Sequence, residues 1–395
     1  MNLELSDVTR KRVVSGASRR VRVLHVNAGN LYGGVETLLT TLAAMRHVCP
    51  GLEPHFATCY EGRSSRELMA AGVPVYMLGE TRISRPWTVW RARRLLRQVL
   101  QKEHFDLVIC HMAWSLVLFG GVARGLQQRV ALWAHGFQSG EHWLERIARR
   151  TTPDLAIANS RFTAANLRDH YPKTPTQVIY CPMALVDLAE ADRCRAAVRH
   201  EQGVDDDTAV ILQVSRLEPL KGQLVHLRAL AQLMAAPKWV CWIAGGPQTR
   251  QEEKYFRELQ ETAYQLGIAE RVRFLGERAD VPKLLAGADI YSQPNQAPEG
   301  FGLVFVEALW AGRPVISSAI GGVLEIVDDS CGLLVAPGDT DALAGSLRLL
   351  IESPEVRQRL GEAGVARARW LCDPTTQMEK LREVSEDKTG HGGWS

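Results

Sequence analysis

The chain has 395 residues, of which 46% are hydrophobic and 23% are charged. This composition is typical of a globular protein, and the length favours two domains. The 47 basic side chains nearly balance the 44 acidic ones, which disfavours a dedicated nucleic-acid-binding protein, because such proteins bind by neutralising phosphates. The charges are unevenly placed, with 24 basic and 13 acidic side chains in residues 1–185 and 23 and 31 in residues 186–395. The basic half suits an anionic ligand, polymer or membrane surface.

The first half of the chain alternates short apolar runs with segments of helical period. Residues 1–20 come before this pattern and are predicted to form a basic, flexible tail. Strands are predicted for residues 21–27, 73–78, 107–110, 130–134, 155–158 and 178–180, and helices for residues 35–45, 90–100 and 162–170. Strands that are apolar throughout and separated by helices indicate a parallel sheet with both faces covered.

The same alternation starts again near Ala209. Strands are predicted for residues 210–214, 239–244, 272–275, 290–292, 314–317 and 333–335, and late helices for residues 357–370 and 375–386. The fold class is therefore α/β, with two Rossmann-like, doubly wound parallel-sheet domains in tandem. We place them at residues 21–185 and 186–370, with the join near residues 182–191. Residues 371–395 are expected to form a helix that packs back on the N-terminal domain, followed by a tail.

Cysteine usage and the lack of long apolar segments favour a cytoplasmic protein. The eight cysteines form no CxxC pair and no zinc-like spacing, and a reduced thiol in an apolar run packs as a small hydrophobe. No apolar segment follows the basic N-terminal residues, and no run reaches the 18 apolar residues that a membrane-spanning helix needs. We therefore expect neither secretion nor a membrane span.

Strand ends of the second half carry residues suited to a nucleotide, because parallel sheets bind ligands beyond the carboxyl ends of their strands. Arg216 and Lys221 follow the first strand of this half. Two cations there would complement a diphosphate, although charges exposed to water are an equally good explanation. Gly300 and Gly302 come just before a helix, where glycine lets the backbone approach a ligand and unpaired N–H groups attract anions. Glu307, about one turn further, would accept hydrogen bonds from ribose hydroxyls or would simply be solvated.

Longer motifs surround these residues. The segment EGFGLVFVE runs from Glu299 to Glu307; SRLEPLKG and FLGERADV come before it, and ALWAGRPVISSAIGGVLEIV and GLLVAPGD come after it. Together these segments resemble the nucleotide-sugar domain of retaining GT-B glycosyltransferases, in particular those of family 4 (GT4). The resemblance covers nearly all of residues 21–370. It implies a GT-B fold, in which two Rossmann-like domains face a deep cleft and the N-terminal domain serves the acceptor.

The resemblance also implies a role for each matching residue. Arg216 and Lys221 would hold the diphosphate of the donor, and Glu307 would hold its ribose. The transferred sugar and its phosphate would contact Glu299 and the backbone of Gly300, Phe301, Gly302 and Leu303. The segment Leu275–Arg278, ending in Arg278, would border the base, and Gly245 and Gly246 would lie near the phosphates.

The acidic residues do not indicate a metal site. Asp205–Asp207 and Asp328–Asp329 are not paired at a strand end and are interpreted as turn and cap residues. The charge of the departing diphosphate would then be met by Arg216 and Lys221. We expect a metal-independent enzyme without a cofactor, since the nucleotide-sugar is a substrate.

The first half contributes glycines and two histidines. Gly33 and Gly34 open a helix, but their spacing from Gly29 does not fit GxGxxG, which disfavours a nicotinamide or flavin enzyme with Glu61 on its ribose. The resemblance places Gly33 and Gly34 across the cleft from the donor, near its phosphates and the acceptor.

His111 and His135 each follow an apolar strand, a position that is more often structural than functional when a histidine stands there alone. They are 24 positions apart and lack a third ligand, which disfavours zinc. By the resemblance, His135 in WAHGF is the active-site histidine near the sugar, and His111 lies on the acceptor side.

Residues 85–102 predict a helix with tryptophans at its start and six basic side chains. This composition suits an anionic lipid surface. An equally good interpretation is a helix that covers the sheet with Leu95, Leu96, Val99 and Leu100 and leaves its arginines in water. On the first interpretation the enzyme is peripheral at the inner face of the membrane.

These expectations combine into one function with open alternatives. The chain is expected to transfer a sugar from a UDP- or GDP-sugar to a lipid-linked, polysaccharide or other acceptor, with retention of the anomeric configuration. His135, Arg216, Lys221 and Glu299 would carry the chemistry. The alternatives are a sugar phosphorylase, a nucleotide-sugar epimerase and a non-catalytic sugar-nucleotide-binding module.

Overall fold

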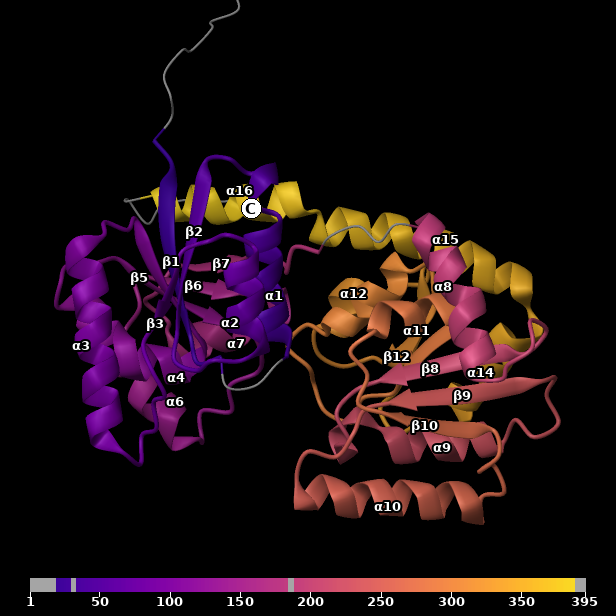
Figure 1. Cartoon of the computed structure of the whole chain (residues 1–395). Coiled ribbons are helices and arrows are strands. Elements are labelled where there is room, and N and C mark those ends of the chain that lie inside the picture. The colour runs from indigo at the N-terminus through magenta and orange to yellow at the C-terminus, as the bar shows by residue number, and fades with distance from the viewer. Residues whose placement is uncertain (1–18, 30–32, 184–187, 388–395) are drawn as a thin grey trace, which may run out of the picture.

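The computed structural model of the chain describes residues 19–29, 33–183 and 188–387. Two lobes lie side by side, each built around a parallel sheet with helices on its faces (Figure 1). Most of the tail predicted for residues 1–20, part of the predicted join and the last eight residues lie outside the described residues.

The described part of the N-terminal lobe contains a seven-stranded parallel sheet in the order β3-β2-β1-β4-β5-β6-β7. Its strands are β1 (Val21–Asn27), β2 (Leu52–Thr58), β3 (Val75–Met77), β4 (Leu107–His111), β5 (Val130–Ala134), β6 (Leu155–Ala158) and β7 (Thr176–Val178). Its helices are α1 (Gly34–Ala44), η1 (Arg46–Val48), α2 (Arg63–Ala70), α3 (Pro86–Lys102), α4 (Met112–Ser115), η2 (Leu116–Gly120), α5 (Gly121–Arg124), α6 (Trp143–Ala148) and α7 (Arg161–His170). The central strands β4 and β5 are buried at every residue, as their continuous apolar runs predict.

The C-terminal lobe contains, in its described part, a six-stranded parallel sheet in the order β10-β9-β8-β11-β12-β13. Its strands are β8 (Ala209–Val214), β9 (Trp239–Ala244), β10 (Val272–Gly276), β11 (Ile290–Gln293), β12 (Val315–Ser318) and β13 (Gly332–Val335). Its helices include α8 (Leu188–Glu201), η3 (Pro219–Lys221), α9 (Gln223–Ala231), α10 (Arg250–Gln265), α11 (Val281–Gly287), α12 (Leu303–Trp310), α13 (Val323–Ile326) and α14 (Thr340–Glu352).

These two parallel sheets confirm the predicted α/β fold class, with differences in detail. The apolar pattern does not predict β2, because Pro54 and His55 interrupt its run. His55 is nevertheless buried, and its Nε2 lies 2.8 Å from an oxygen of Glu53. The last strand of this sheet ends at Val178, earlier than predicted, since the residues after it lead toward the other lobe.

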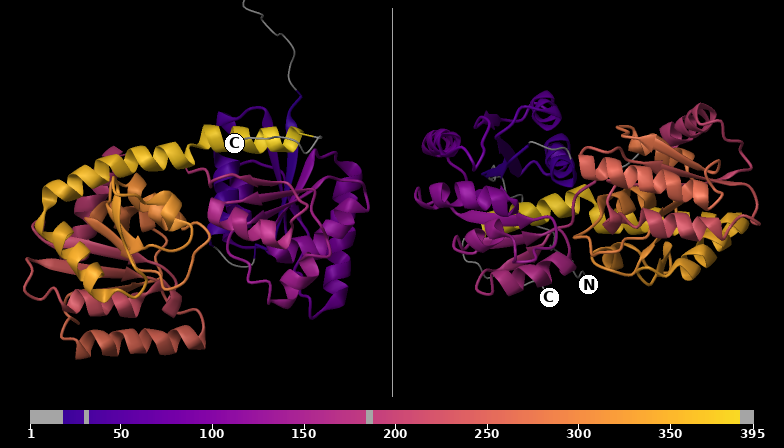
Figure 2. Two further views of the ribbon diagram at one scale, coloured as in Figure 1. Left: turned by 180° about the vertical axis from the view of Figure 1, so that it is seen from behind. Right: turned by 90° about the horizontal axis from the view of Figure 1, so that it is seen from below.

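Two consecutive helices, α15 (Pro354–Cys372) and α16 (Pro374–Glu386), span the lobes (Figures 1 and 2). The first packs against α12 and the second against β1 and β2. Met378 and Leu381 of α16 are fully buried, and Arg129 donates hydrogen bonds to the carbonyl oxygens of Val384 and Ser385 at 2.9 and 3.1 Å. The last helix that the structure describes therefore completes the core of the N-terminal lobe.

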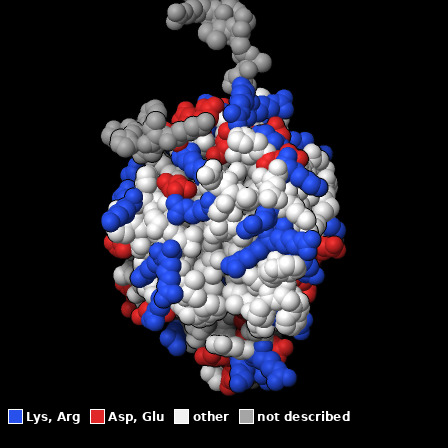
Figure 3. Space-filling view, turned by 90° about the vertical axis from the view of Figure 1, so that its left-hand side faces the viewer, with Lys and Arg blue, Asp and Glu red and all other residues white. Residues whose placement is uncertain are grey.

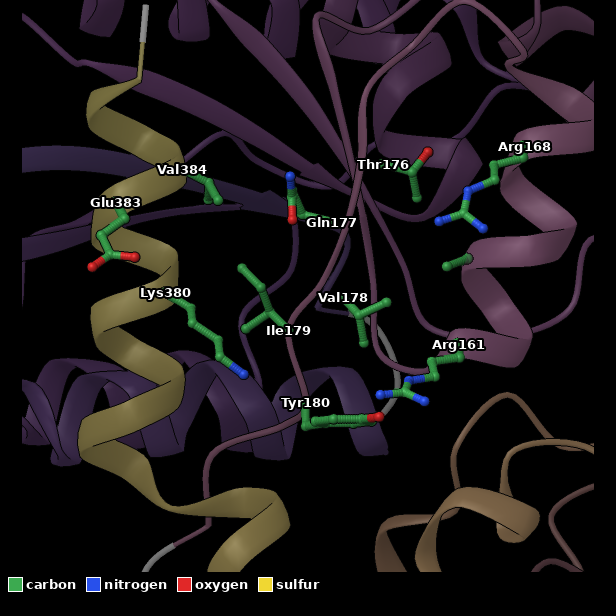
Figure 4. A pocket seen from close by; sticks show the side chains of 11 residues that line it. Arg161, Arg168, Thr176, Gln177, Val178, Ile179, Tyr180, Lys380, Glu383 and Val384 are labelled. Carbon is green, nitrogen blue, oxygen red and sulfur yellow. The ribbon is translucent and has the colours of Figure 1, made fainter. Parts of the chain in front are cut away.

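β7 is an edge strand of the N-terminal sheet, and a pocket lies beside it. A pocket of about 640 Å³ lies between α7, β7 and α16 (Figure 4). Val178 and Ile179 supply apolar surface to it, and Arg161, Arg168 and Lys380 line it with cations. Long charged side chains thus stand at the edge strand where another sheet or helix would otherwise pack, which is a common way of protecting an edge strand.

Glu325 of α13 joins the lobes at the start of α7. Its carboxylate accepts the backbone N–H groups of Arg161 and Phe162, both at 2.8 Å, and the hydroxyl of Tyr180 at 2.9 Å. The first N–H groups of a helix lack partners within the helix and favour a negative charge. Ser160, the N-cap of α7, accepts the N–H of Thr163, and the C-terminal lobe supplies the acceptor for the two N–H groups before it.

Replacing Glu325 with alanine is expected to loosen this junction. The loss of three hydrogen bonds, two of them to the start of a helix, should lower the free energy of unfolding by about 1–3 kcal/mol. Small-angle scattering should show a larger radius of gyration, and urea denaturation should give the change in stability. The variant Glu325→Gln, which keeps an acceptor but loses the charge, should fall between the two. Equal radii and equal midpoints for all three proteins would show that the contact does not hold the lobes.

Candidate active site

The order of strands reverses at β1/β4 in one sheet and at β8/β11 in the other, and ligands of such sheets bind at these switch points. Several predicted site residues lie there. His111 ends β4, Arg216 and Lys221 follow β8, and Glu299 follows β11. The topology therefore gathers residues that are far apart in the sequence.

Lys221 and Glu299 form an ion pair at 2.8 Å, with side chains that are 17% and 28% exposed. The other carboxylate oxygen accepts hydrogen bonds from Asn295 at 3.0 Å and from Gln293 at 3.5 Å. Glu299 is thus held from several sides. Lys221 is not a free cation, so a bound diphosphate would have to share it with Glu299.

Arg216 lies nearby in a looser setting. Its side chain is 67% exposed, and its guanidinium lies 2.8 Å from a carboxylate oxygen of Glu218. An ion pair so exposed contributes little to stability. Arg216 can therefore exchange Glu218 for another anion at low cost.

The glycine-rich segment leads into α12 as predicted. Gly302, the N-cap of α12, has a φ of +95°, and a Cβ there would lie 2.5 Å from the ring of Phe305. Phe301 is buried and stacks on Tyr180 with ring centroids 5.5 Å apart. Its side chain therefore belongs to the packing between the lobes, and only its backbone is available to a ligand.

Glu307 lies in the second turn of α12. Burial disfavours the charged form of its carboxyl and raises the pKa to about 7. Within the described residues, its carboxylate makes no ion pair or hydrogen bond. A buried carboxylate in this state is suited to accept hydroxyl hydrogen bonds from a ligand.

The segment before α12 meets the N-terminal lobe directly. A Cβ at Gly300 would lie 2.5 Å from Cα of Gly136 and 2.8 Å from the carbonyl oxygen of His135, and the hydroxyl of Ser160 donates to the carbonyl of Gly300. Only glycine allows this approach. The structure thus brings His135 of one lobe against the predicted donor segment of the other.

The start of α1 lies on the same side. Gly33 donates its N–H to Glu36 at 3.1 Å, which caps the helix. A Cβ at Gly34 would lie 3.4 Å from the side chain of Leu303 at the start of α12. The N-termini of α1 and α12 therefore approach each other between the lobes, where both favour an anion.

Gly245 and Gly246 allow loops after three strands to pack closely. Gly245 has a φ of +150°, and a Cβ there would lie 2.1 Å from the carbonyl oxygen of Ser215. A Cβ at Gly246 would lie 3.0 Å from the backbone nitrogen of Glu277. The need for glycine is therefore explained by the protein's own packing, and contact with phosphates stays a prediction.

Arg278 is engaged within the protein. Its guanidinium bonds both carboxylate oxygens of Asp280, at 2.7 and 2.8 Å, and one oxygen of Glu201 at 2.8 Å. These two carboxylates raise the pKa of Arg278. That Arg278 borders the base of the donor stays a prediction. With the guanidinium engaged, the contact would be made by its backbone or by the aliphatic part of its side chain.

The two predicted histidines belong to a row of three. Nδ1 of His111 lies 2.8 Å from Nε2 of His135, and Nε2 of His111 lies 3.0 Å from Nδ1 of His25. Sequence reasoning missed His25 because it stands inside the apolar strand β1. The alternation of side chains along a strand could have pointed to it, because alternation puts His25 on the same face of the sheet as Asn27 at the strand end. Within the described residues, no cluster of three His, Cys, Asp or Glu side chains is arranged to hold a metal.

Comparison with known proteins shows the family of the chain. The profile described as Glycosyl transferases group 1 matches residues 195–367, and the profile described as Glycosyltransferase Family 4 matches residues 32–185. D-inositol 3-phosphate glycosyltransferase of Corynebacterium glutamicum is 32% identical over 327 residues, which cover 74% of this chain and 77% of that relative. The chain belongs to glycosyltransferase family 4.

Other relatives agree with this assignment. The glycosyltransferase is 30% identical over 296 residues to the GDP-mannose-dependent monoacylated alpha-(1-6)-phosphatidylinositol monomannoside mannosyltransferase of C. glutamicum, covering 70% of this chain and 75% of that one. It is also similar to HepE of Anabaena, solved in complex with UDP-glucose, with a TM-score of 0.79 and 25% identity over 92% of this chain and 99% of that one. The predicted family, the GT-B fold and the predicted class of function, a nucleotide-sugar-dependent glycosyltransferase, are confirmed.

Proposed function

We propose that this glycosyltransferase transfers a sugar from a UDP- or GDP-sugar with retention of the anomeric configuration, without a metal ion or a cofactor. The observation that carries the proposal is the lobe junction just before α12, where Glu299 pairs with Lys221 and the next residue, Gly300, packs against the backbone of His135 from the other lobe. Relatives named for GDP-mannose use and crystallised with UDP-glucose support these donor classes.

The departing diphosphate would be stabilised by the protein's own charges. Lys221 and Arg216 both lie in the segment between β8 and α9, and the first N–H groups of α12 add positive potential. Glu299 is neutralised by Lys221 and holds two amide hydrogen bonds. A carboxylate so engaged is a poor nucleophile, which supports retention without a covalent intermediate on Glu299.

A direct assay tests this proposal. The purified protein should show a thermal shift with one nucleoside diphosphate in the presence of EDTA, because a ligand that binds the folded state raises the midpoint. The matching UDP- or GDP-sugar should then be consumed with an acceptor alcohol, and proton NMR should show that the product keeps the donor's anomeric configuration. Turnover that needs inorganic phosphate would indicate a phosphorylase, and interconversion of the donor alone an epimerase. Binding without any turnover would favour the non-catalytic module.

We further propose a lipid-linked acceptor and contact with an anionic membrane surface through α3. Trp87 and Trp90 of this helix are 65% and 64% exposed. Trp90 and Arg93 border two grooves at once, an apolar one of about 340 Å³ that reaches Trp143 and a basic one of about 500 Å³ that includes Arg94 and Arg97. Figure 3 shows basic side chains spread over this largely uncharged face.

The burial of α3 agrees with the interpretation in which this helix covers the core, and its exposed side chains support the proposed membrane contact. Leu96 and Leu100 are buried in the apolar core beside the sheet, and Leu95 and Val99 are partly buried against it. Trp87 and Trp90 are exposed. Within the described residues, no helix is long and apolar enough to cross a bilayer. Attachment through α3 would therefore be peripheral.

Vesicle sedimentation tests the contact. The protein should bind phosphatidylglycerol vesicles at low salt, and Arg94→Gln with Arg97→Gln should lower its partition coefficient by about 10- to 30-fold, at about 1 kcal/mol per basic residue. The matched control, Lys254→Gln with Arg257→Gln on exposed α10, should bind like the parent. Equal loss in both pairs, or no binding by the parent, would contradict a specific role for α3.

A further inference from the structure

A row of stacked rings lies in the N-terminal lobe, next to the candidate active site. His25 stands in β1, His111 ends β4, and Trp133 and His135 stand at the end of β5. His111 stacks on His135 and on Trp133, with centroids 5.1 and 5.4 Å apart, and Phe56 stacks on His25 at 5.3 Å. This packing fixes the planes of the three imidazoles.

Hydrogen bonds between ring nitrogens link these imidazoles, and each such bond needs one protonated and one bare nitrogen. Burial lowers the pKa of His25 and the pKa of His135 to about 3, and lowers the pKa of His111 well below its ordinary value. Near neutral pH each ring therefore carries a single N–H. The row can then exist in only two proton arrangements.

The two arrangements differ at the ends of the row. In one, Nδ1–H of His25 donates to His111, Nδ1–H of His111 donates to His135, and His135 keeps its own proton on Nδ1. In the other arrangement both bonds are reversed, so that His135 donates to His111 and His111 donates to His25. His25, at the buried end of the row, then carries its proton on Nε2. That Nε2 is buried and has no hydrogen-bond partner among the described residues. Because buried N–H groups without an acceptor are especially rare, the first arrangement is favoured.

We propose that His111 and His25 are positioning residues that hold His135 as the Nδ1–H tautomer, so that it presents a hydrogen-bond donor to an oxygen of the bound sugar. His135 is the only partly exposed member of the row, and its carbonyl oxygen lies at the contact with Gly300. Among the described residues, Nε2 of His25 has no partner from which to take a proton, so the row fixes a tautomer and does not relay protons. The sugar contact rests on the proposed function, whereas the tautomer does not.

NMR of the full chain labelled with ¹⁵N-histidine tests the tautomer without any substrate. Ring ¹⁵N shifts distinguish the two tautomers, and the signal of His135 is assigned from its loss in His135→Gln. His135 should be the Nδ1–H form in the parent. His111→Phe keeps a stacking ring but removes the donor, and should release His135 toward the Nε2–H form. His111→Asn supplies an amide donor near the position of Nδ1 and should restore the parent form.

Kinetics with the identified donor give the second readout. His111→Phe should lower kcat by at least about tenfold with little change in the donor's KM, as expected when a histidine is left in the wrong tautomer, and His111→Asn should recover most of it. Nε2–H at His135 in the parent would overturn the proposal, as would equal kcat for the folded Phe and Asn variants. A confirmed tautomer in a protein without transferase activity would instead count against the proposed function alone.

Discussion

Replacing Lys221 with alanine is expected to lower kcat by about 100- to 1000-fold, the loss typical of removing one preorganised charge from a developing anion. Lys221 is the less exposed of the two cations after β8, so its interaction with a diphosphate is less screened by water. Arg216→Ala should cost less for the same reason. Steady-state kinetics with the identified nucleotide-sugar, together with donor binding measured by calorimetry, give both effects.

The pair with Glu299 complicates this variant, because Lys221→Ala leaves a partly buried carboxylate without its partner. Removing one member of such a pair destabilises a protein more than removing both. The double variant Lys221→Met, Glu299→Gln should therefore regain stability over the single Lys221→Met variant. It should remain as slow in transfer, because it still lacks the charge that the diphosphate needs. Recovery of activity with stability would show that Lys221 acts only through folding.

The chain's apolar runs were sufficient to predict most of the architecture. Buried parallel strands such as β4 and β5 leave a continuous apolar signal, and glycines before helices mark the loops where a ligand binds. A strand such as β2 escapes this reasoning, because proline and a buried histidine break its pattern and only tertiary contacts compensate. The same local reasoning located Lys221, Glu299 and His135 at strand ends.

What local reasoning could not give is which of these side chains touch. Lys221 and Glu299 are 78 positions apart, and Glu325 binds the start of α7 across 164 positions. Such pairings are decided by strand order and lobe contact, which leave no trace in residue types. His25 shows a further limit, since a histidine within an apolar strand looks like a packing residue until its ring is seen against His111.

Glu307→Gln is expected to stabilise the protein at pH 8 while weakening donor binding. The folded carboxyl has a pKa of about 7, above its unfolded value, so the folded state holds a proton that the unfolded state releases. The contribution of this carboxyl to the free energy of unfolding is therefore largest below its unfolded pKa. It decreases as pH rises and is lost once pH has passed the folded pKa of about 7, because the folded carboxyl must then ionise while buried. The ionised carboxylate costs at most about 3 kcal/mol at pH 8. Glutamine cannot ionise and avoids that cost.

Urea denaturation should therefore show the Glu307→Gln variant more stable than the parent at pH 8, with a difference that shrinks as pH falls and vanishes below the unfolded pKa of the carboxyl, at about pH 4. Donor affinity should move the other way, with Kd raised by about 10- to 100-fold, because a carboxylate accepts stronger hydrogen bonds from hydroxyls than an amide does. The parent's own affinity should weaken as pH falls below 7 and the carboxyl is protonated. A variant less stable at pH 8, or one that binds the donor as the parent does, would show that the burial of this carboxylate serves packing and not the ligand.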